Sequence, residues 1–165
     1  MADLETPRLY PYREDPQQTR LGQPVLRPFV PVSFVVNDVS TPELEGLIDS
    51  GADAVLASDL LAEELGVNLR DNEGEARHRV GGRSVTARYK NVTLRLHDPD
   101  PASDSVCEWP SSVGFVDGWH SFRFVLLGSV GFLDRFTLTA SRFAQAVAIE
   151  DRDVFNDRFG VVHPA

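Results

Sequence analysis

The sequence predicts a mainly β domain, and two observations lead to this fold class. Short runs rich in Val, Phe, Leu and Ile alternate with glycine- and proline-containing turns along most of the chain. Helical periodicity is clear in one segment, whereas parallel βαβ units would need a helix between successive strands. With 165 residues and 42% hydrophobic content, the chain is long enough for one domain with a proper core.

The first half of the domain is expected to contain an arm and two strands. Residues 1–24 are polar and proline-bearing and show no periodicity, which predicts a flexible N-terminal arm. The run VLRPFVPVSFVVND (residues 25–38) predicts an edge strand or the start of a strand, because it is rich in Val and Phe and is broken by proline. The next run rises into the apolar Gly46-Leu47-Ile48 and turns at Ser50-Gly51.

The segment SDLLAEELGV predicts the clearest helix of the chain. Ser58 is a candidate N-cap, and Gly66 suits the C-terminal end. Leu60, Leu61 and Leu65 form the apolar stripe that would face the core.

The second half of the domain is predicted to consist of further strands. HRVGGRSVTARYKNVTLRL (residues 78–96) alternates apolar and polar side chains around two glycines, which is typical of a hairpin with a glycine tip. The remaining expected elements are a long acidic loop over residues 97–112, strands at 113–118 and 122–128, a short helix at 131–136, and strands at 136–140 and 144–150. The pattern of the tail, residues 151–165, is ambiguous between helix and strand.

Charge and cysteine content exclude several classes of partner. The net charge of −9 and pI near 4.8 describe a surface that repels phosphate backbones and anionic lipid, so we expect neither nucleic acid nor membrane partners. Cys107 is the single cysteine, so no internal disulfide can form, and a small buried apolar role is expected for it. The polar start has no apolar signal region, and a cytoplasmic location is the default expectation.

Most common catalytic and metal-binding motifs fit this sequence poorly. The fragment GSVG at residues 128–131 is one residue short of a nucleophile elbow. The histidines are scattered without helical pairing or cysteine partners, so we expect no metal site and no cofactor. These histidines are His78, His97, His120 and His163, and each is expected to be a surface or hydrogen-bonded residue.

Asp49 remains as the candidate functional residue, because the residues around it are suited to hold and orient its carboxylate. An apolar strand precedes it and would hold its carboxylate rigidly at the strand end. Gly51 permits a tight turn and leaves an N–H free to donate to the carboxylate. Ser50 can place its hydroxyl on a neighbouring chain segment, and Ala52 is small enough for another backbone to approach.

A single carboxylate in this position is a poor catalyst of amide hydrolysis. Two carboxylates that share one proton can act together, one as a base toward water and the other as an acid toward the carbonyl. The chain has one Asp-Ser-Gly, so the second copy must come from a second subunit across a two-fold axis.

In order along residues 29–149, the chain resembles the retropepsins, the single-motif aspartic proteases of retroviruses and bacteria. The resemblance rests on the strand FVPVSFVV, the signature LIDSGADAVLAS, the glycine-tipped hairpin HRVGGRSVTA where the family has its flap, and the later motif FVLLGSVGFLDRF.

The resemblance implies a closed β-barrel-like acid protease fold with one or two short helices over residues 25–150, and a homodimer that hydrolyses peptides through an activated water. It implies that the tail, residues 151–165, takes part in the dimer interface. An extended peptide or protein substrate would bind as an added strand.

The resemblance also implies roles for individual residues. Asp49 would be the catalytic residue of each subunit, with Ser50, Gly51, Ala52 and Asp53 as catalytic-loop support. In that loop Ser50 would bond across the dimer, and Gly51 and Ala52 would line the substrate floor. The flap and substrate-binding residues would be Val80, Gly81, Gly82 and Arg83, and the second motif that packs behind the catalytic loop would be Leu126, Leu127 and Gly128.

The sequence departs from the family pattern after Gly128. Many family members have an arginine there that pairs with the acid following the catalytic loop, here Asp53, whereas this chain continues Ser129-Val130-Gly131. Arg135 is the candidate replacement. Dimer support from terminal strands would have to come from AQAVAIE and the tail.

Three functions therefore stand as hypotheses. The first is a homodimeric aspartic endopeptidase. The second is a catalytically silent retropepsin-like module for dimerisation or peptide binding, and the third is an unrelated β-barrel that binds a ligand in a deep internal cavity.

Overall fold

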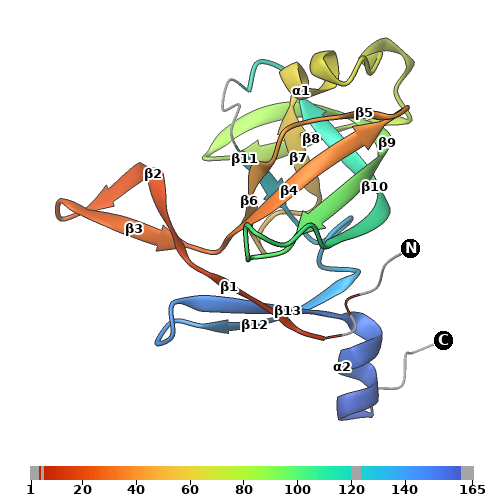
Figure 1. Ribbon diagram of the computed structural model, residues 1–165. Coiled ribbons are helices and arrows are strands. Elements are labelled where there is room, and N and C mark those ends of the chain that lie inside the picture. The colour runs from red at the N-terminus through yellow and green to blue at the C-terminus, as the bar shows by residue number, and fades with distance from the viewer. Residues whose placement is uncertain (1–3, 5, 120–123, 161–165) are drawn as a thin grey trace.

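The computed structural model of the chain describes residue 4, residues 6–119 and residues 124–160. It is mainly β, as the sequence predicts (Figure 1). The strands are β1 (Arg8–Pro11), β2 (Arg13–Arg20), β3 (Gln23–Arg27), β4 (Phe29–Val36), β5 (Val39–Ser40), β6 (Leu44–Ile48), β7 (Val55–Ser58), β8 (Gly74–Val80), β9 (Arg83–His97), β10 (Val106–Val116), β11 (Phe124–Leu127), β12 (Phe136–Ser141) and β13 (Ala146–Asp151). The helices are α1 (Asp59–Glu64), α2 (Arg152–Phe159) and a single 3₁₀ turn at Leu69–Asp71.

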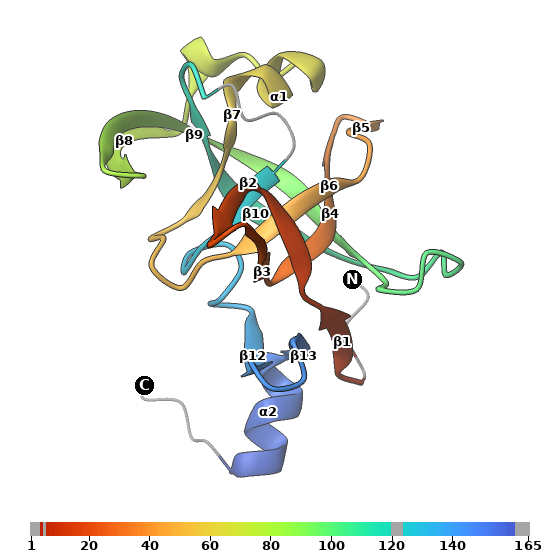
Figure 2. The same cartoon turned by 90° about the vertical axis from the view of Figure 1, so that its left-hand side faces the viewer.

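A closed barrel forms the body of the molecule. Its described strands follow the order β4, β6, β11, β7, β10, β9, and β9 pairs back onto β4. Strands β5 and β8 extend β4 and β9 beyond the closed ring. The views in Figures 1 and 2 show this barrel above a smaller layer made by β1, β12, β13 and α2. The expected closed β-barrel-like architecture is therefore confirmed.

The barrel strands share one apolar core. In β4, every residue from Phe29 to Phe34 is buried, including Pro31, so the first apolar run of the barrel is a buried strand. In β9 the buried apolar side chains switch from one face of the strand to the other. Val92, Leu94 and Leu96 join the main core, while Ala87 belongs to a second cluster. Because successive side chains of a strand point to opposite faces, the two halves of β9 serve two different faces of the sheet.

That second cluster lies on the side that carries the hairpin tip. It consists of four buried side chains, which are Leu56, Ala87, Val116 and Leu126. Val80 and Tyr89 pack against them. The hairpin of β8 and β9 is thus anchored on apolar side chains of the barrel.

Helix α1 confirms the local signals in the sequence. The Ser58 hydroxyl accepts from the N–H of Leu60 at 3.3 Å, as expected for an N-cap. Gly66 adopts a left-handed φ of +67° directly after the C-cap Leu65. Leu61 and Leu65 are buried, while Leu60 is half-buried at the rim of the core.

The expected flexible arm over residues 1–24 is wrong for residues 8–24. Strand β1 pairs antiparallel with β13, and β2 and β3 form a two-stranded hairpin. Tyr10 is buried, and its hydroxyl donates to the carbonyl of His97 at 2.9 Å. Because β1 is an edge strand, Pro11 is tolerated in it, and one buried aromatic side chain anchors a segment that is otherwise polar.

The expected acidic loop over residues 97–112 is too long. Strand β10 begins at Val106 and pairs with β9 without interruption from Val106 opposite His97 to Val116 opposite Ala87. Within β10, the side chains of Cys107, Trp109 and Ser111 are buried at every second position. This period of two identifies the strand, although Glu108 and Pro110 between these positions suggest a loop.

Two further expectations need correction at the C-terminal end. Residues 131–135 form turns rather than a helix, because Leu133 and Asp134 donate their N–H groups back to the carbonyls of Gly128 and Ser129, five residues earlier. The ambiguous tail contains α2, capped by the Asp151 carboxylate and ended by Gly160 at φ +64°. The expectations for His120, His163 and residues 161–165 lie outside the described residues.

Across the parts of the chain that the structure describes, no helix combines the length and the apolar character needed to cross a membrane.

Candidate active site

Asp49 lies immediately after β6, at the point where the strand leaves the sheet. Strand β6 runs parallel to β11, with Ile48 opposite Leu127. The backbone N–H of Asp49 continues this pairing by donating to the carbonyl of Leu127 at 3.1 Å. The residue is therefore mounted on the sheet by its main chain, as the sequence predicts for an acid that ends an apolar strand.

A tight turn orients the Asp49 carboxylate. The N–H of Gly51 donates to Oδ1 of Asp49 at 2.9 Å, and the N–H of Ala52 donates to the Asp49 carbonyl at 3.1 Å. A Cβ atom added to Gly51 would lie 3.2 Å from that same Oδ1. Asp49 is half-buried and Ser50 is exposed, so the loop presents its carboxylate and its hydroxyl at the protein surface.

Gly128 brings the second motif against the back of this loop. The N–H groups of Ser129 and Val130 donate to the carbonyls of Ala52 and Asp53, at 2.8 and 2.9 Å. A Cβ on Gly128 would approach the carbonyl oxygens of Ala52 and Ala54 to 2.6 and 2.4 Å, closer than side-chain carbons ever come. Only glycine fits at this crossing of two backbones.

Strand β11 runs between the two strands that the Asp49 loop connects. It is parallel to β6 and pairs antiparallel with β7 through Leu126 opposite Leu56. The loop from β6 to β7 therefore spans the end of β11, and Leu127 and Gly128 lie beneath it. This local topology explains why the two motifs, far apart in sequence, form one structural unit.

The β8–β9 hairpin has the tight tip that the two glycines predict. Gly81 and Gly82 both have left-handed φ values, +56° and +80°, and Val80 pairs with Arg83 across the turn. These are the backbone angles of a two-residue hairpin turn of the primed type, which favours glycine or asparagine. We call this hairpin, from β8 to the start of β9, the flap.

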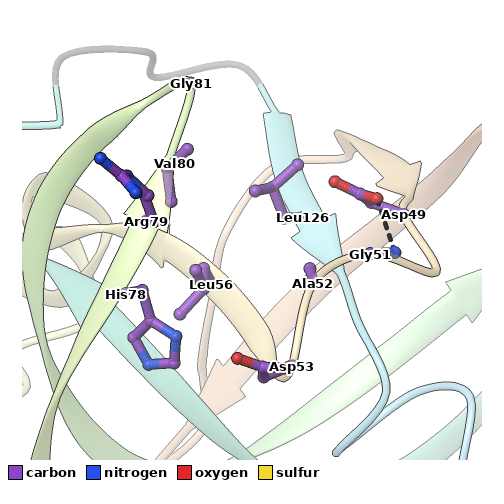
Figure 3. Close-up of a pocket in the computed structure, with 10 residues that line it drawn as sticks. All are labelled: Asp49, Gly51, Ala52, Asp53, Leu56, His78, Arg79, Val80, Gly81 and Leu126. Atoms are coloured by element: carbon purple, nitrogen blue, oxygen red, sulfur yellow. Dashed lines mark hydrogen bonds between the residues drawn. The ribbon is translucent and has the colours of Figure 1, made fainter.

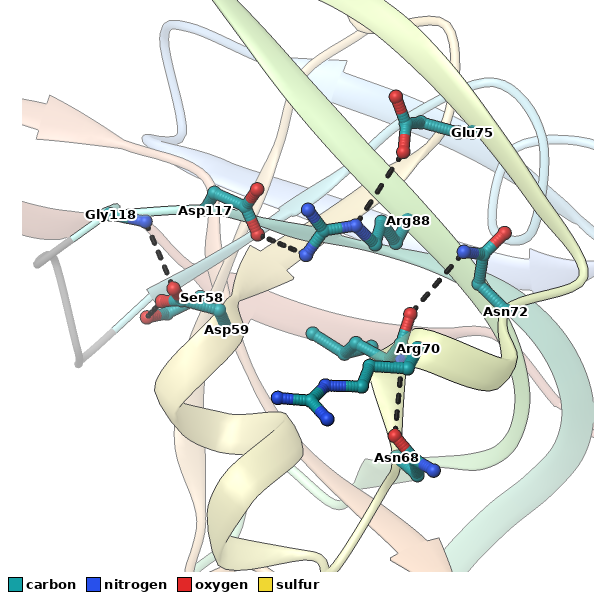
Figure 4. A network of polar contacts seen from close by, with 10 residues as sticks. Ser58, Asp59, Asn68, Arg70, Asn72, Glu75, Arg88, Asp117 and Gly118 are labelled. Carbon is teal, nitrogen blue, oxygen red and sulfur yellow. Dashed lines mark hydrogen bonds and ion pairs between the residues drawn. The ribbon is translucent and has the colours of Figure 1, made fainter.

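Ion pairs tie the flap strands to the rest of the barrel. Arg88 of β9 contacts Glu75 of β8 at 3.5 Å and Asp117, just after β10, at 2.8 Å (Figure 4). Next to them, the N–H of Gly118 donates to the Asp59 carboxylate of α1 at 2.9 Å. Arg88 thus binds the base of the flap to the segment that follows β10.

A small pocket of about 110 Å³ separates the Asp49 loop from the flap. Figure 3 shows the loop on one side and the flap strand on the other, with Leu56 and Leu126 between them. The lining residues are Asp49, Gly51, Ala52, Asp53, Leu56, His78, Arg79, Val80, Gly81 and Leu126.

The pocket unites most of the residues that the sequence singles out, but not all. From the catalytic loop, the flap and the second motif it is lined by Asp49, Gly51, Ala52, Asp53, Val80, Gly81 and Leu126. The remaining predicted residues, Ser50, Gly82, Arg83, Leu127 and Gly128, do not line it.

Three lining residues are not predicted from the sequence. Nothing in the sequence indicates Leu56 or Arg79 as pocket residues. His78 could have been indicated, because it lies two residues before Val80 and therefore shares its face of the strand. Its Nε2 lies 2.6 Å from the Tyr89 hydroxyl. Burial raises the pKa of Tyr89, and the nearby Asp53 carboxylate acts in the same direction.

The prediction that Arg135 replaces the missing arginine as the partner of Asp53 is wrong. Arg135 lies 3.5 Å from Asp151 at the start of α2, and its guanidinium lies over the Trp109 and Phe136 rings. It therefore connects the barrel to the smaller layer of β1, β12, β13 and α2 rather than to the Asp49 loop. Asp53 is exposed, and the described residues include no ion pair to it.

The described residues contain no group of three or more His, Cys, Asp or Glu side chains that could hold a metal ion. Cys107 is buried in the core, and burial raises the pKa of its thiol.

The fold is similar to that of a solved retropepsin-like aspartic protease from Rickettsia conorii. The TM-score is 0.51 at 14% sequence identity, and the alignment covers 90% of this chain and 96% of that chain. No protein-family model matches the sequence, and no curated protein matches it either. The chain thus has the retropepsin-like fold that its motifs predict.

Proposed function

We propose that this chain is one subunit of a homodimeric aspartic endopeptidase. The observation that carries the proposal is the position of Asp49 in a retropepsin-like fold. Its carboxylate follows β6, accepts the N–H of Gly51, and lines a pocket whose opposite wall is the flap. Fold likeness alone would not be enough, because one fold can serve several functions.

The pocket of one chain is half of the site that this chemistry needs. At about 110 Å³ it is well below the ~300 Å³ typical of the smallest ligand pockets. It also contains one Asp-Ser-Gly carboxylate, whereas the reaction needs an acid and a base. A two-fold axis beside Asp49 supplies the second carboxylate and doubles the pocket.

The two Asp49 carboxylates of the dimer share one proton. The ionised one takes a proton from a water molecule as the water oxygen attacks the peptide carbonyl carbon, and the protonated one donates to the carbonyl oxygen. The carboxyl that took the water proton then protonates the leaving nitrogen, and the C–N bond of the tetrahedral intermediate breaks. The other carboxylate takes a proton from a hydroxyl of the intermediate as the new carboxyl group forms, which restores the shared proton. The bond from Gly51 holds each carboxylate in the direction that this exchange requires.

Neighbouring residues serve the same reaction. Ser50 is exposed beside Asp49, and we assign its hydroxyl a hydrogen bond to the partner subunit. The substrate is an extended peptide that pairs as an added strand beneath the flap, with Val80 and Gly81 above it. We also place the enzyme in the cytoplasm, since a chain with one cysteine has no internal disulfide to maintain.

The test is incubation of the wild type and of Asp49→Asn with a diverse peptide library at several pH values. The proposal expects cleavage by the wild type that increases on acidification and is lost in the variant. Sedimentation at the assay concentration is measured in parallel. A wild-type protein that is monomeric, or a dimer that cleaves no peptide at any pH, contradicts the proposal.

One observation favours a second candidate, a catalytically silent module that binds peptides or dimerises. The arginine that would support Asp53 in the family pattern is absent, and Arg135 pairs with Asp151 instead. A catalytic loop without this support could keep the fold and lose the dyad geometry. The same experiment separates the candidates, because the silent module gives a dimer that binds peptides without cleaving them.

A further inference from the structure

The β2–β3 hairpin stands clear of the barrel (Figure 1). Its strands pair with each other and with no other described strand. At about 3.3 Å per residue, the eight residues of β2 give it a reach of about 25 Å. A two-stranded hairpin is at best marginally stable alone, so a projecting one of this length suggests a partner that covers it.

The base of this hairpin lies next to Asp49. The N–H of Ile48 donates to the carbonyl of Pro28, the residue between β3 and β4, at 3.1 Å. Arg13, at the start of β2, lies 3.9 Å from Glu45 of β6. The hairpin therefore leaves the barrel beside the strand whose end carries the candidate catalytic residue.

Internal contacts make the hairpin a defined structure rather than a loose tail. Arg27 pairs with Asp15 at 2.8 Å, and Asp15 is only 7% exposed. Arg27 also donates to the Gln18 amide oxygen at 2.6 Å. An ordered hairpin loses little conformational entropy when it docks on a partner.

The tip presents an unusual pair of residues to solvent. Leu21 is 96% exposed and has a left-handed φ of +53°, a conformation in which asparagine or glycine is favoured. Arg20 beside it is also exposed. Arginine is one of the residue types that are enriched at interface hot spots, and an exposed apolar side chain at the free end of an ordered arm gains free energy when a partner buries it.

Charge indicates what the arm contacts. Residues 13–27 contain three arginines and two carboxylates, a net charge of +1, whereas the whole chain carries −9. A second copy of this chain thus offers an acidic surface to a slightly basic arm, which offsets part of the repulsion between the two bodies. Because β2 is irregular between Asp15 and Thr19 and β3 contains Pro24, contact through side chains is favoured over continuation of a sheet.

We infer that the β2–β3 hairpin is a dimer arm, which reaches across the two-fold axis and docks its Arg20–Leu21 tip on the second copy of this chain. The inference rests on the proposed function in one respect, that a second copy sits beside Asp49. The arm then acts alongside the catalytic loop in holding the two copies together.

The first test measures dimer dissociation by sedimentation for Arg20→Glu and Leu21→Asp. Each variant is expected to raise the dissociation constant about tenfold, the effect of losing one strong interface contact. Both side chains are exposed in the single chain, so folding is not at risk. Val39→Asp is the matched control, because Val39 is 45% exposed beside another two-residue left-handed turn, at Asn37-Asp38, and should leave the dimer unchanged.

The second test locates the contact directly. In Leu21→Cys the new thiol is the accessible one, since Cys107 is buried, and it is loaded with a photoreactive maleimide. Mixing ¹⁵N-labelled and unlabelled protein distinguishes crosslinks between copies from those within one chain. Crosslinks between copies are expected, and crosslinks within one chain alone overturn the inference.

The outcomes separate this inference from the proposed function. A dimer whose dissociation constant is insensitive to both tip variants overturns the arm while the protease proposal stands. If the tip variants change KM for a protein substrate and leave dimerisation unchanged, the hairpin binds substrate and the arm is again rejected. A dimer that depends on the tip but cleaves no peptide supports the arm and contradicts the protease.

Discussion

Gly51 donates its backbone N–H to Oδ1 of Asp49, two residues earlier in the same turn, at 2.9 Å. The donor is a backbone group, so no side chain is needed to orient the carboxylate. The turn donates no hydrogen bond to the second carboxylate oxygen, Oδ2. Orientation of the acid is therefore a property of the loop backbone, which β6 and β11 hold in place. The consequences of this arrangement can be measured.

Replacement of Asp49 by Asn should abolish the chemistry and preserve the structure. The Asn amide oxygen can still accept the Gly51 N–H, but the amide can neither share nor transfer a proton. We expect peptide hydrolysis to fall about 10²–10⁴-fold, the usual contribution of a general acid or base. Melting temperature and sedimentation should match the wild type. Full activity in a dimeric Asp49→Asn protein would reject Asp49 as the catalyst.

Replacement of Gly128 by Ala should displace the Asp49 loop, which packs against Gly128. The new Cβ would overlap the Ala54 and Ala52 carbonyl oxygens, which are backbone atoms and cannot rotate away. A loss of about 1–3 kcal/mol in unfolding free energy is expected, as for other overpacked sites. Thermal denaturation measures it, with Gly74→Ala as the control, because a Cβ on Gly74 meets nothing within 4 Å. Equal melting temperatures for the two variants would contradict this account.

The parts of the site that the sequence predicts are those built by local chain geometry. The Asp49 turn, the Ser58 cap and the Gly81-Gly82 tip each depend on a few consecutive residues, and the structure has all three. From the residues alone, the sequence predicts only that a strand ends at Gly128. Its place behind the Asp49 loop is implied by the family resemblance and by no local signal.

Long-range pairing explains most of what the sequence does not predict. Nothing in residues 8–11 indicates that they pair with residues 146–149, and only Tyr10 among them is buried. In the same way, Arg135 has Asp53 and Asp151 as possible partners, and the choice depends on where the turn at 131–135 points. His78 could have been found from its shared face with Val80, but the Tyr89 hydroxyl that it meets comes from the other strand.

At the flap tip, the nature of the side chain should matter more than its size. A Cβ added to Gly81 would meet no atom within 4 Å, but the φ of +56° means that strain rather than collision limits substitution. Gly81→Asn should retain activity, since asparagine tolerates this conformation. Gly81→Val costs about 1–2 kcal/mol in the left-handed region. If the closed flap needs this turn, kcat/KM falls roughly tenfold. The two variants are compared by peptide hydrolysis, and equal activity would show that the tip conformation is not needed.

The pH dependence of stability should oppose the pH dependence of the proposed reaction. Burial lowers the pKa of His97 from its ordinary value near 6.5, with Arg95 acting in the same direction and Glu43 against it. Its Nε2 lies 2.8 Å from the hydroxyl of Ser33, which is buried in β4. The unfolded chain therefore binds this proton at higher pH than the folded chain does, and acid favours unfolding. The contribution of His97 to stability is complete above about pH 6.5 and is lost progressively as the pH falls toward the folded-state value.

His97→Gln tests this, because glutamine can bond Ser33 without titrating. Melting temperatures are measured between pH 7.5 and pH 5 for both proteins, and the wild type should lose more stability over this range than the variant. The shared-proton mechanism predicts faster hydrolysis in acid, whereas His97 makes the folded state more stable at neutral pH. The wild type should therefore hydrolyse peptides best at an intermediate pH. In His97→Gln that optimum should move to lower pH. Parallel melting curves for the two proteins would remove His97 as the cause of any acid instability.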